Sequence, residues 1–163
     1  MSLTALLWSG TAAAADPASE RLVLLADVGE RTAEVEVGVM KPFDVYLVAE
    51  RDQENPQISA VVFKLELPEG VLLIGEELLV ESLIALGTPK AGLNLAFHCV
   101  ESQQVKVYHF RLAARRPLAK AVVRLAPDPR TNFLGVVSCK DENYDKWASE
   151  ESTFTITATP DTR

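Results

Sequence analysis

Three oxygen-bearing side chains near the C-terminal end could bind a cation. Asp141, Asn143 and Asp145 have the alternate spacing with which a calcium-binding loop begins. The rest of the EF-hand pattern is absent, because Lys146 stands where that loop needs glycine and Ser152 where it needs a bidentate glutamate. Calcium held in an irregular oxygen cage is therefore the one cofactor hypothesis, and otherwise we expect none.

Two aromatic residues of the same segment could recognise a ligand. Tyr144 and Trp147 would lie on the rim of a β-structure, where aromatic rings stack on sugars or anchor a protein partner. The alternative is that Trp147 folds back and closes one end of the hydrophobic core. Both interpretations remain open at the level of sequence.

The two histidines could supply nitrogen ligands to a metal. If residues 92–101 and 104–112 form a hairpin, His98 and His109 become diagonal neighbours on its outer side. No third ligand stands at a matching position, so two ordinary surface histidines are the simpler interpretation.

The two cysteines, Cys99 and Cys139, lie near the ends of predicted strands. An even, minimal cysteine count in an exported protein predicts a disulfide. Two buried free thiols are the alternative. A zinc site is not expected, because no CxxC or HxxxH spacing accompanies them.

Signatures of catalysis are missing from the chain. It has no GxSxG, no glycine-rich phosphate loop and no HExxH. The adjacent carboxylates Glu76 and Glu77, like Glu150 and Glu151, would point to opposite sides of a strand, which does not suit acid–base work on one substrate. We therefore predict that the protein is not an enzyme.

Length and charge indicate one acidic globular domain. The chain has 163 residues, 48% of them hydrophobic, and a formal net charge of -7, which disfavours nucleic acid as a partner. Residues 1–15 resemble a truncated signal peptide with small residues before Asp16, although an ordinary N-terminal tail is the alternative. We expect a single domain over residues 16–159, a frayed tail over 160–163, no membrane span and an extracellular or periplasmic location.

A strand ending in a tight turn is the clearest structural signal. In residues 58–67, Val61, Phe63 and Leu65 alternate with more polar positions, the period of a strand with one buried face. Pro68, Glu69 and Gly70 then predict a turn before the next strand.

The remaining elements follow the same alternation. Residues 32–39, 44–49, 120–126, 133–138 and 153–158 read as strands. The opening strand, residues 22–26, is expected beside residues 44–49 as a hairpin neighbour. Pairing residues 92–101 with 104–112 around Ser102 and Gln103 would place Leu95 opposite Phe110. Residues 76–86 are either a helix or a loop followed by a strand, with the strand favoured.

The pattern predicts an all-β, two-sheet antiparallel sandwich of about nine or ten short strands with at most one short helix. The order of DVYLVA, the turn LPEGV and GLNLAF resembles the cohesin-like and immunoglobulin-like sandwich modules of exported bacterial proteins, over residues 41–158. The resemblance implies a cohesin-like or immunoglobulin-like sandwich in an exported protein, and a jelly-roll is the alternative fold.

The expected function follows from the signal-like start, the disulfide and the missing catalytic residues. We expect an exported, non-enzymatic module that mediates protein contact or assembly at the cell surface. Two alternatives remain: a carbohydrate-binding module that uses Tyr144 and Trp147 on a polysaccharide, and a structural subunit that self-associates through an edge strand into a filament or layer.

Overall fold

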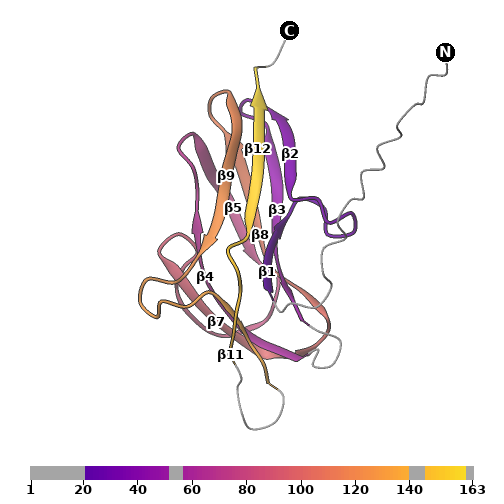
Figure 1. Ribbon diagram of the computed structural model, residues 1–163, viewed down its shortest axis with the longest axis vertical. Coiled ribbons are helices and arrows are strands. Elements are labelled where there is room, and N and C mark those ends of the chain that lie inside the picture. The colour runs from indigo at the N-terminus through magenta and orange to yellow at the C-terminus, as the bar shows by residue number, and fades with distance from the viewer. Residues whose placement is uncertain (1–20, 52–56, 140–145, 161–163) are drawn as a thin grey trace, which may run out of the picture.

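Strands account for all the regular structure that the computed structural model describes, which covers residues 21–51, 57–139 and 146–160. Figure 1 shows them packed as two layers. The strands are β1 (Arg21–Leu25), β2 (Glu34–Gly38), β3 (Pro42–Glu50), β4 (Gln57–Glu66), β5 (Val71–Leu78), β6 (Ser82–Thr88), β7 (Gly92–Glu101), β8 (Gln104–Ala114), β9 (Leu118–Ala126), β10 (Gly135–Val137), β11 (Lys146–Ala148) and β12 (Thr153–Thr159). The predicted all-β sandwich is confirmed, and these described ranges contain no helical membrane span.

The smaller sheet has four strands in the order β1, β3, β8, β5, all antiparallel. The expected pairing of the opening strand is confirmed, since Leu22 lies opposite Ala49 and Leu24 opposite Leu47. These two strands are not a hairpin, however, because β2 between them belongs to the other sheet.

The larger sheet is built around β4, which pairs with β7 along one edge and with β10 and β9 in succession along the other. β6 extends the sheet beyond β7, and β11 extends it beyond β10. On the far side, β12 joins β9, and β2 joins β12 in parallel. This parallel pair is the one departure, among the described strands, from the antiparallel arrangement that we predicted.

The core lies between the two sheets and contains the side chains that strand alternation predicts to be inside. Phe63, Leu95 and Phe110 are at most 1% exposed, and Leu65 is 2% exposed. The Phe63 ring makes an edge-to-face contact with Phe110 at a centroid distance of 6.4 Å. The fully buried aromatic side chains thus hold the two layers together.

The predicted hairpin of residues 92–112 is wrong. β7 pairs with β4 and β6, whereas β8 pairs with β3 and β5, so the chain crosses from one sheet to the other at residues 101–104. The side chains of Leu95 and Phe110 still point into the same core, but from opposite layers. Alternation predicts which side of a strand is buried, and a crossing between layers satisfies it as well as a hairpin does.

The ambiguous segment, residues 76–86, contains no helix. β5 continues to Leu78, residues 79–81 form a short connection, and β6 begins at Ser82, so the favoured strand interpretation is confirmed. The turn at Pro68 is also confirmed: the Val71 amide donates to the Pro68 carbonyl oxygen at 3.1 Å, and Gly70 has a φ of 94°.

Candidate functional site

The outer surface of the larger sheet is uncharged over two rows of residues, which we call the apolar face. Cross-strand register aligns side chains on β6, β7, β4 and β10, and all of them alternate with buried positions such as Val61 and Leu95. The first row is Ile84, Ala96, Ala60 and Val137, and the second is Leu86, Asn94, Val62 and Gly135.

Exposure on the apolar face is greatest at its β6 end. Ile84 and Leu86 are 56% and 57% exposed, whereas Ala60, Ala96 and Val137 are half-buried in the flat centre. Large apolar side chains with this exposure favour contact with another molecule. The apolar face is therefore the part of the described surface best suited to bind an apolar partner.

The outer surface of the four-stranded sheet carries a cluster of charged groups that contact one another, beside the exposed apolar side chains of Leu72 and Ile74 on β5. His109 Nε2 lies 2.8 Å from a carboxylate oxygen of Asp44, and its Nδ1 lies 3.6 Å from one of Glu77. The same ring stacks on Tyr46 at 4.9 Å, and Lys106 lies over the Tyr46 ring at 5.4 Å. The two outer surfaces of the sandwich thus differ in chemistry.

The proposed pairing of the two histidines is wrong. His98 lies on β7 in the larger sheet and His109 on β8 in the smaller one. Since the two strands belong to different layers, the two rings do not share an outer surface. The metal hypothesis fails with the hairpin on which it rested.

The predicted disulfide is present, and Cys99 and Cys139 are bonded with their Cα atoms 6.0 Å apart. Cys99 lies on β7 and Cys139 follows β10 by two residues. Because β7 and β10 pair with opposite edges of β4, the disulfide joins the two neighbours of the central strand. The alternative of two free thiols is wrong.

The calcium hypothesis concerns residues outside the described ranges. Asp141, Asn143 and Asp145, together with Tyr144, lie there, so calcium binding and the role of Tyr144 stay predictions. Trp147 lies on β11 and is 40% exposed, with the guanidinium carbon of Arg51 5.5 Å from its ring centroid. Trp147 therefore lies at the surface and does not close the core.

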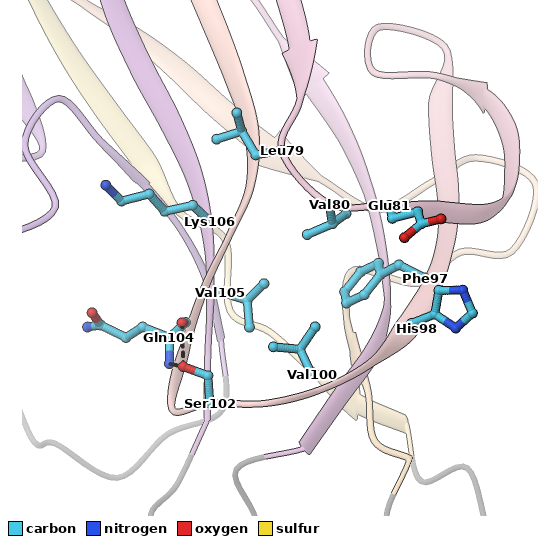
Figure 2. A pocket seen from close by; sticks show the side chains of 10 residues that line it. All are labelled: Leu79, Val80, Glu81, Phe97, His98, Val100, Ser102, Gln104, Val105 and Lys106. Carbon is cyan, nitrogen blue, oxygen red and sulfur yellow. Dashed lines mark hydrogen bonds between the residues drawn. The ribbon is translucent and has the colours of Figure 1, made fainter.

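A groove of about 390 Å³ opens where the chain crosses between the sheets at β7 and β8. Figure 2 shows Phe97, Val100 and Val105 converging on its floor, while the His98 and Lys106 side chains point away. The wall is the connection from β5 to β6, residues 79–81. A second hollow of about 340 Å³ lies between β5 and the turn after β6. The surface on this side of the sandwich, where β5 of one sheet lies near β6 of the other, is therefore uneven and partly apolar.

An ion pair between the buried Asp128 and the exposed Arg130 holds the turn between β6 and β7. Asp128 is fully buried and accepts hydrogen bonds from Asn94 at 2.8 Å and from the Arg130 guanidinium at 2.6 Å. The hydrogen bond from Arg130 keeps the pKa of Asp128 below its ordinary value, although burial opposes this. Arg130 also donates to the carbonyl oxygens of Leu86 and Gly92, which fixes the end of the apolar face.

Sequence reasoning missed the apolar face, although a signal for it exists. In residues 60–63, Ala-Val-Val-Phe, and residues 83–86, Leu-Ile-Ala-Leu, apolar side chains occupy both sides of the strand. A strand with one solvated side should alternate with polar residues, so these two runs mark places where the outer side is apolar as well.

No family model and no curated protein matches this chain. Among solved structures, the cohesin module of a family 33 glycoside hydrolase from Clostridium perfringens ATCC13124 is similar, with a TM-score of 0.59 and 14% identity over 87% of this chain and 99% of that module. The seventh ScaB type I cohesin from Pseudobacteroides cellulosolvens has a TM-score of 0.59 and 13% identity over 89% of this chain and 96% of its own. The third ScaB cohesin of R. flavefaciens, solved in complex with a group 1 dockerin, has a TM-score of 0.53 and 13% identity over 87% and 97%. The chain therefore has a cohesin-like β-sandwich fold.

Proposed function

We propose that this chain is a non-enzymatic protein-binding module that docks its partner on the apolar face. The observation that carries the proposal is the contrast between the two outer surfaces of the sandwich. One has eight uncharged positions in two aligned rows, of which Val62 and Gly135 are buried, whereas the other carries a cluster of charged groups in mutual contact around His109. Protein interfaces have cores that are poor in charge and rich in apolar contact, which matches the first surface.

The similar structures support the same class of function. The R. flavefaciens cohesin was solved with a dockerin, and so was the OlpA cohesin of Clostridium thermocellum, which has a TM-score of 0.55 and 8% identity to this chain. These dockerin complexes were formed by the neighbouring proteins. For this chain, the complexes make a folded protein module the first kind of partner to test.

The proposal includes an exported location. The disulfide between Cys99 and Cys139 supports it, because such bonds persist in oxidising compartments and are rare in the cytosol. The apolar face would then meet its partner outside the cytoplasm, in the extracellular medium or the periplasm.

A lysine in the middle of the apolar face tests the docking site. Val137→Lys places a charge beside Ala60 on the half-buried centre of the face, and a buried unpaired charge opposes docking. Val23→Lys is the matched control, because Val23 is also a half-buried valine facing outward, but on β1 of the other sheet. Both variants are compared with the wild type by thermal melting before binding is measured.

The probes are a panel of dockerin modules and the secreted proteins of the producing organism, captured on the immobilised chain and then measured singly by calorimetry. A purified partner that binds the wild type and Val23→Lys, and binds Val137→Lys at least about tenfold more weakly, supports the proposal. Equal loss in both variants would place the docking site elsewhere. Finding no binding protein in either source would contradict the protein-binding function itself.

A further inference from the structure

The outer edge of β6 has no strand partner among the described residues. β6 pairs with β7 along one edge only, and every residue from Ser82 to Thr88 is exposed. Leu83, Ile84 and Leu86 are 56%, 56% and 57% exposed. An unpaired, uncharged and apolar edge is a template for pairing with another strand.

The sequence of β6 is complementary to itself in the antiparallel direction. Ser-Leu-Ile-Ala-Leu-Gly-Thr has Ala85 at its centre, so that a two-fold axis through Ala85 sets Ile84 opposite Leu86 and Ser82 opposite Thr88. We propose that two copies of this chain associate through antiparallel pairing of their β6 edges about Ala85. A shift by one residue would place Ile84 opposite Gly87 and would lose both apolar pairs.

Charge complementarity supports this register. Glu81 and Lys90 flank β6, both are exposed, and neither forms an ion pair with a described residue. With Ala85 on the axis, Glu81 of one copy falls opposite Pro89 of the other and hence next to its Lys90. The contact occurs twice by symmetry. In a chain with a net charge of -7, an edge without like-charge repulsion is where two copies can approach.

The pairing has two consequences for shape. Because the axis is perpendicular to the sheet, the apolar faces of both copies lie on the same side and form one continuous surface. Because the contact uses the same edge twice, it closes at two copies and does not grow into a filament.

The dimer is weak. Leu83 is the extra residue of a bulge, which shortens the regular stretch of pairing. The Leu86 carbonyl oxygen already accepts a hydrogen bond from Arg130. The side-chain contacts of Ile84 and Leu86 therefore contribute most of the affinity. An interface of one short strand belongs to the small, transient class.

Charge reversal tests the register by analytical ultracentrifugation over a concentration series. Glu81→Lys alone brings two lysine side chains together at each of the two contacts, and Lys90→Glu alone brings two glutamates together there. Each variant should therefore dimerise about tenfold more weakly than the wild type. A mixture of the two variants restores opposite charges at both contacts of each mixed pair, so it should dimerise more strongly than either variant alone. Lys106→Glu, on the other sheet, is the control for the change in net charge that Lys90→Glu makes.

A cysteine at the axis provides a second measurement that does not depend on charge. In antiparallel pairs facing Cα atoms are about 4.5–5.5 Å apart, within the range of a disulfide. Ala85→Cys should therefore form a covalent dimer on a non-reducing gel under mild oxidation, since both native cysteines are already bonded. Ala119→Cys, at an exposed position on β9, should not.

The outcomes separate this dimer from others. A dimer that is weakened by each reversal, strengthened on mixing and trapped by Ala85→Cys supports the proposal. The proposal is overturned if the chain is a strict monomer at millimolar concentration. It is also overturned if a dimer forms whose affinity is unchanged by both charge reversals and whose Ala85→Cys variant is not cross-linked. Val137 lies on β10, three strands from β6. The effect of Val137→Lys on partner binding is therefore independent of the dimerisation measurements at β6.

Discussion

Cys99 and Cys139 are covalently bonded although they belong to segments on opposite edges of β4. The bond therefore ties the two neighbours of the central strand of the larger sheet. It closes a loop with a sequence separation of 40, for which chain entropy gives a stabilisation of about 4 kcal/mol.

Replacing both cysteines by serine should lower the free energy of unfolding by about 4 kcal/mol, because the unfolded chain regains the entropy of an open loop. Denaturant unfolding of the double variant measures the loss. The reduced wild type is the control and should unfold at the same denaturant concentration. Free thiols titrated in the denatured, unreduced wild type would contradict the bond itself.

Gly87→Ala should destabilise the turn between β6 and β7. Gly87 has a φ of 97°, and a Cβ atom there would collide with the carbonyl oxygen of Gly92. The left-handed backbone alone costs about 1–2 kcal/mol for a residue with a side chain, and the collision adds to this. Thermal melting checks the loss. Gly75→Ala is the matched control, because its new Cβ would make only an ordinary contact at 3.6 Å with Arg111, and its stability should change little.

Glu50, at the end of β3, forms an ion pair with Arg31 in the loop before β2. Acid should weaken this contact by protonating Glu50. Burial alone would raise the pKa of Glu50, but hydrogen bonds from Arg31 and Arg21 outweigh it and hold the pKa below the ordinary value of 4.5. A carboxyl group whose pKa is lowered by folding stabilises the protein above its unfolded pKa, and this stabilisation disappears as the pH falls through the folded pKa.

Glu50→Gln should therefore be less stable than the wild type at pH 7, and the difference should shrink as the pH falls below about 4.5. Urea unfolding at several pH values measures both proteins. Asp128 has a lowered pKa too, so the wild type and the variant must be compared at each pH. A difference that stays constant down to strongly acidic pH would show that Glu50 is not the titrating group.

Phe63→Ala should remove a large part of the core. Phe63 is fully buried and contacts both Tyr108 and Phe110 edge to face. Truncations of buried phenylalanine cost about 3–5 kcal/mol, since the cavity does not close completely. Tyr46→Ala, on the outer side of β3, removes an aromatic ring outside the core and should cost much less. Chemical denaturation of the two variants makes the comparison, and equal losses would contradict the assigned core.

Strand alternation is a local property, and it was enough to predict the buried side chains. Val61, Phe63, Leu65, Leu95 and Phe110 all lie in the core as expected, because a period of two assigns the side of each residue without reference to other strands. The disulfide was also predictable, since two cysteines permit a single pairing.

The candidate site was not predictable in the same way. The apolar face needs β6, β7, β4 and β10 in that order, and these strands are far apart in the sequence. Its exposed runs, such as Leu-Ile-Ala-Leu, are visible in the sequence, but only cross-strand register shows that Ile84 and Val137 belong to one row.

The sequence by itself therefore determined the class of fold, the inside and outside of most strands, and the covalent bond, because each depends on neighbouring residues or on a single possible pairing. Only the tertiary structure decided that β7 and β8 lie in different sheets, that two apolar rows share one outer surface, and that a charged cluster around His109 lies on the other. Strand order depends on long-range backbone pairing, and alternating side chains satisfy a hairpin and a crossing between layers equally well.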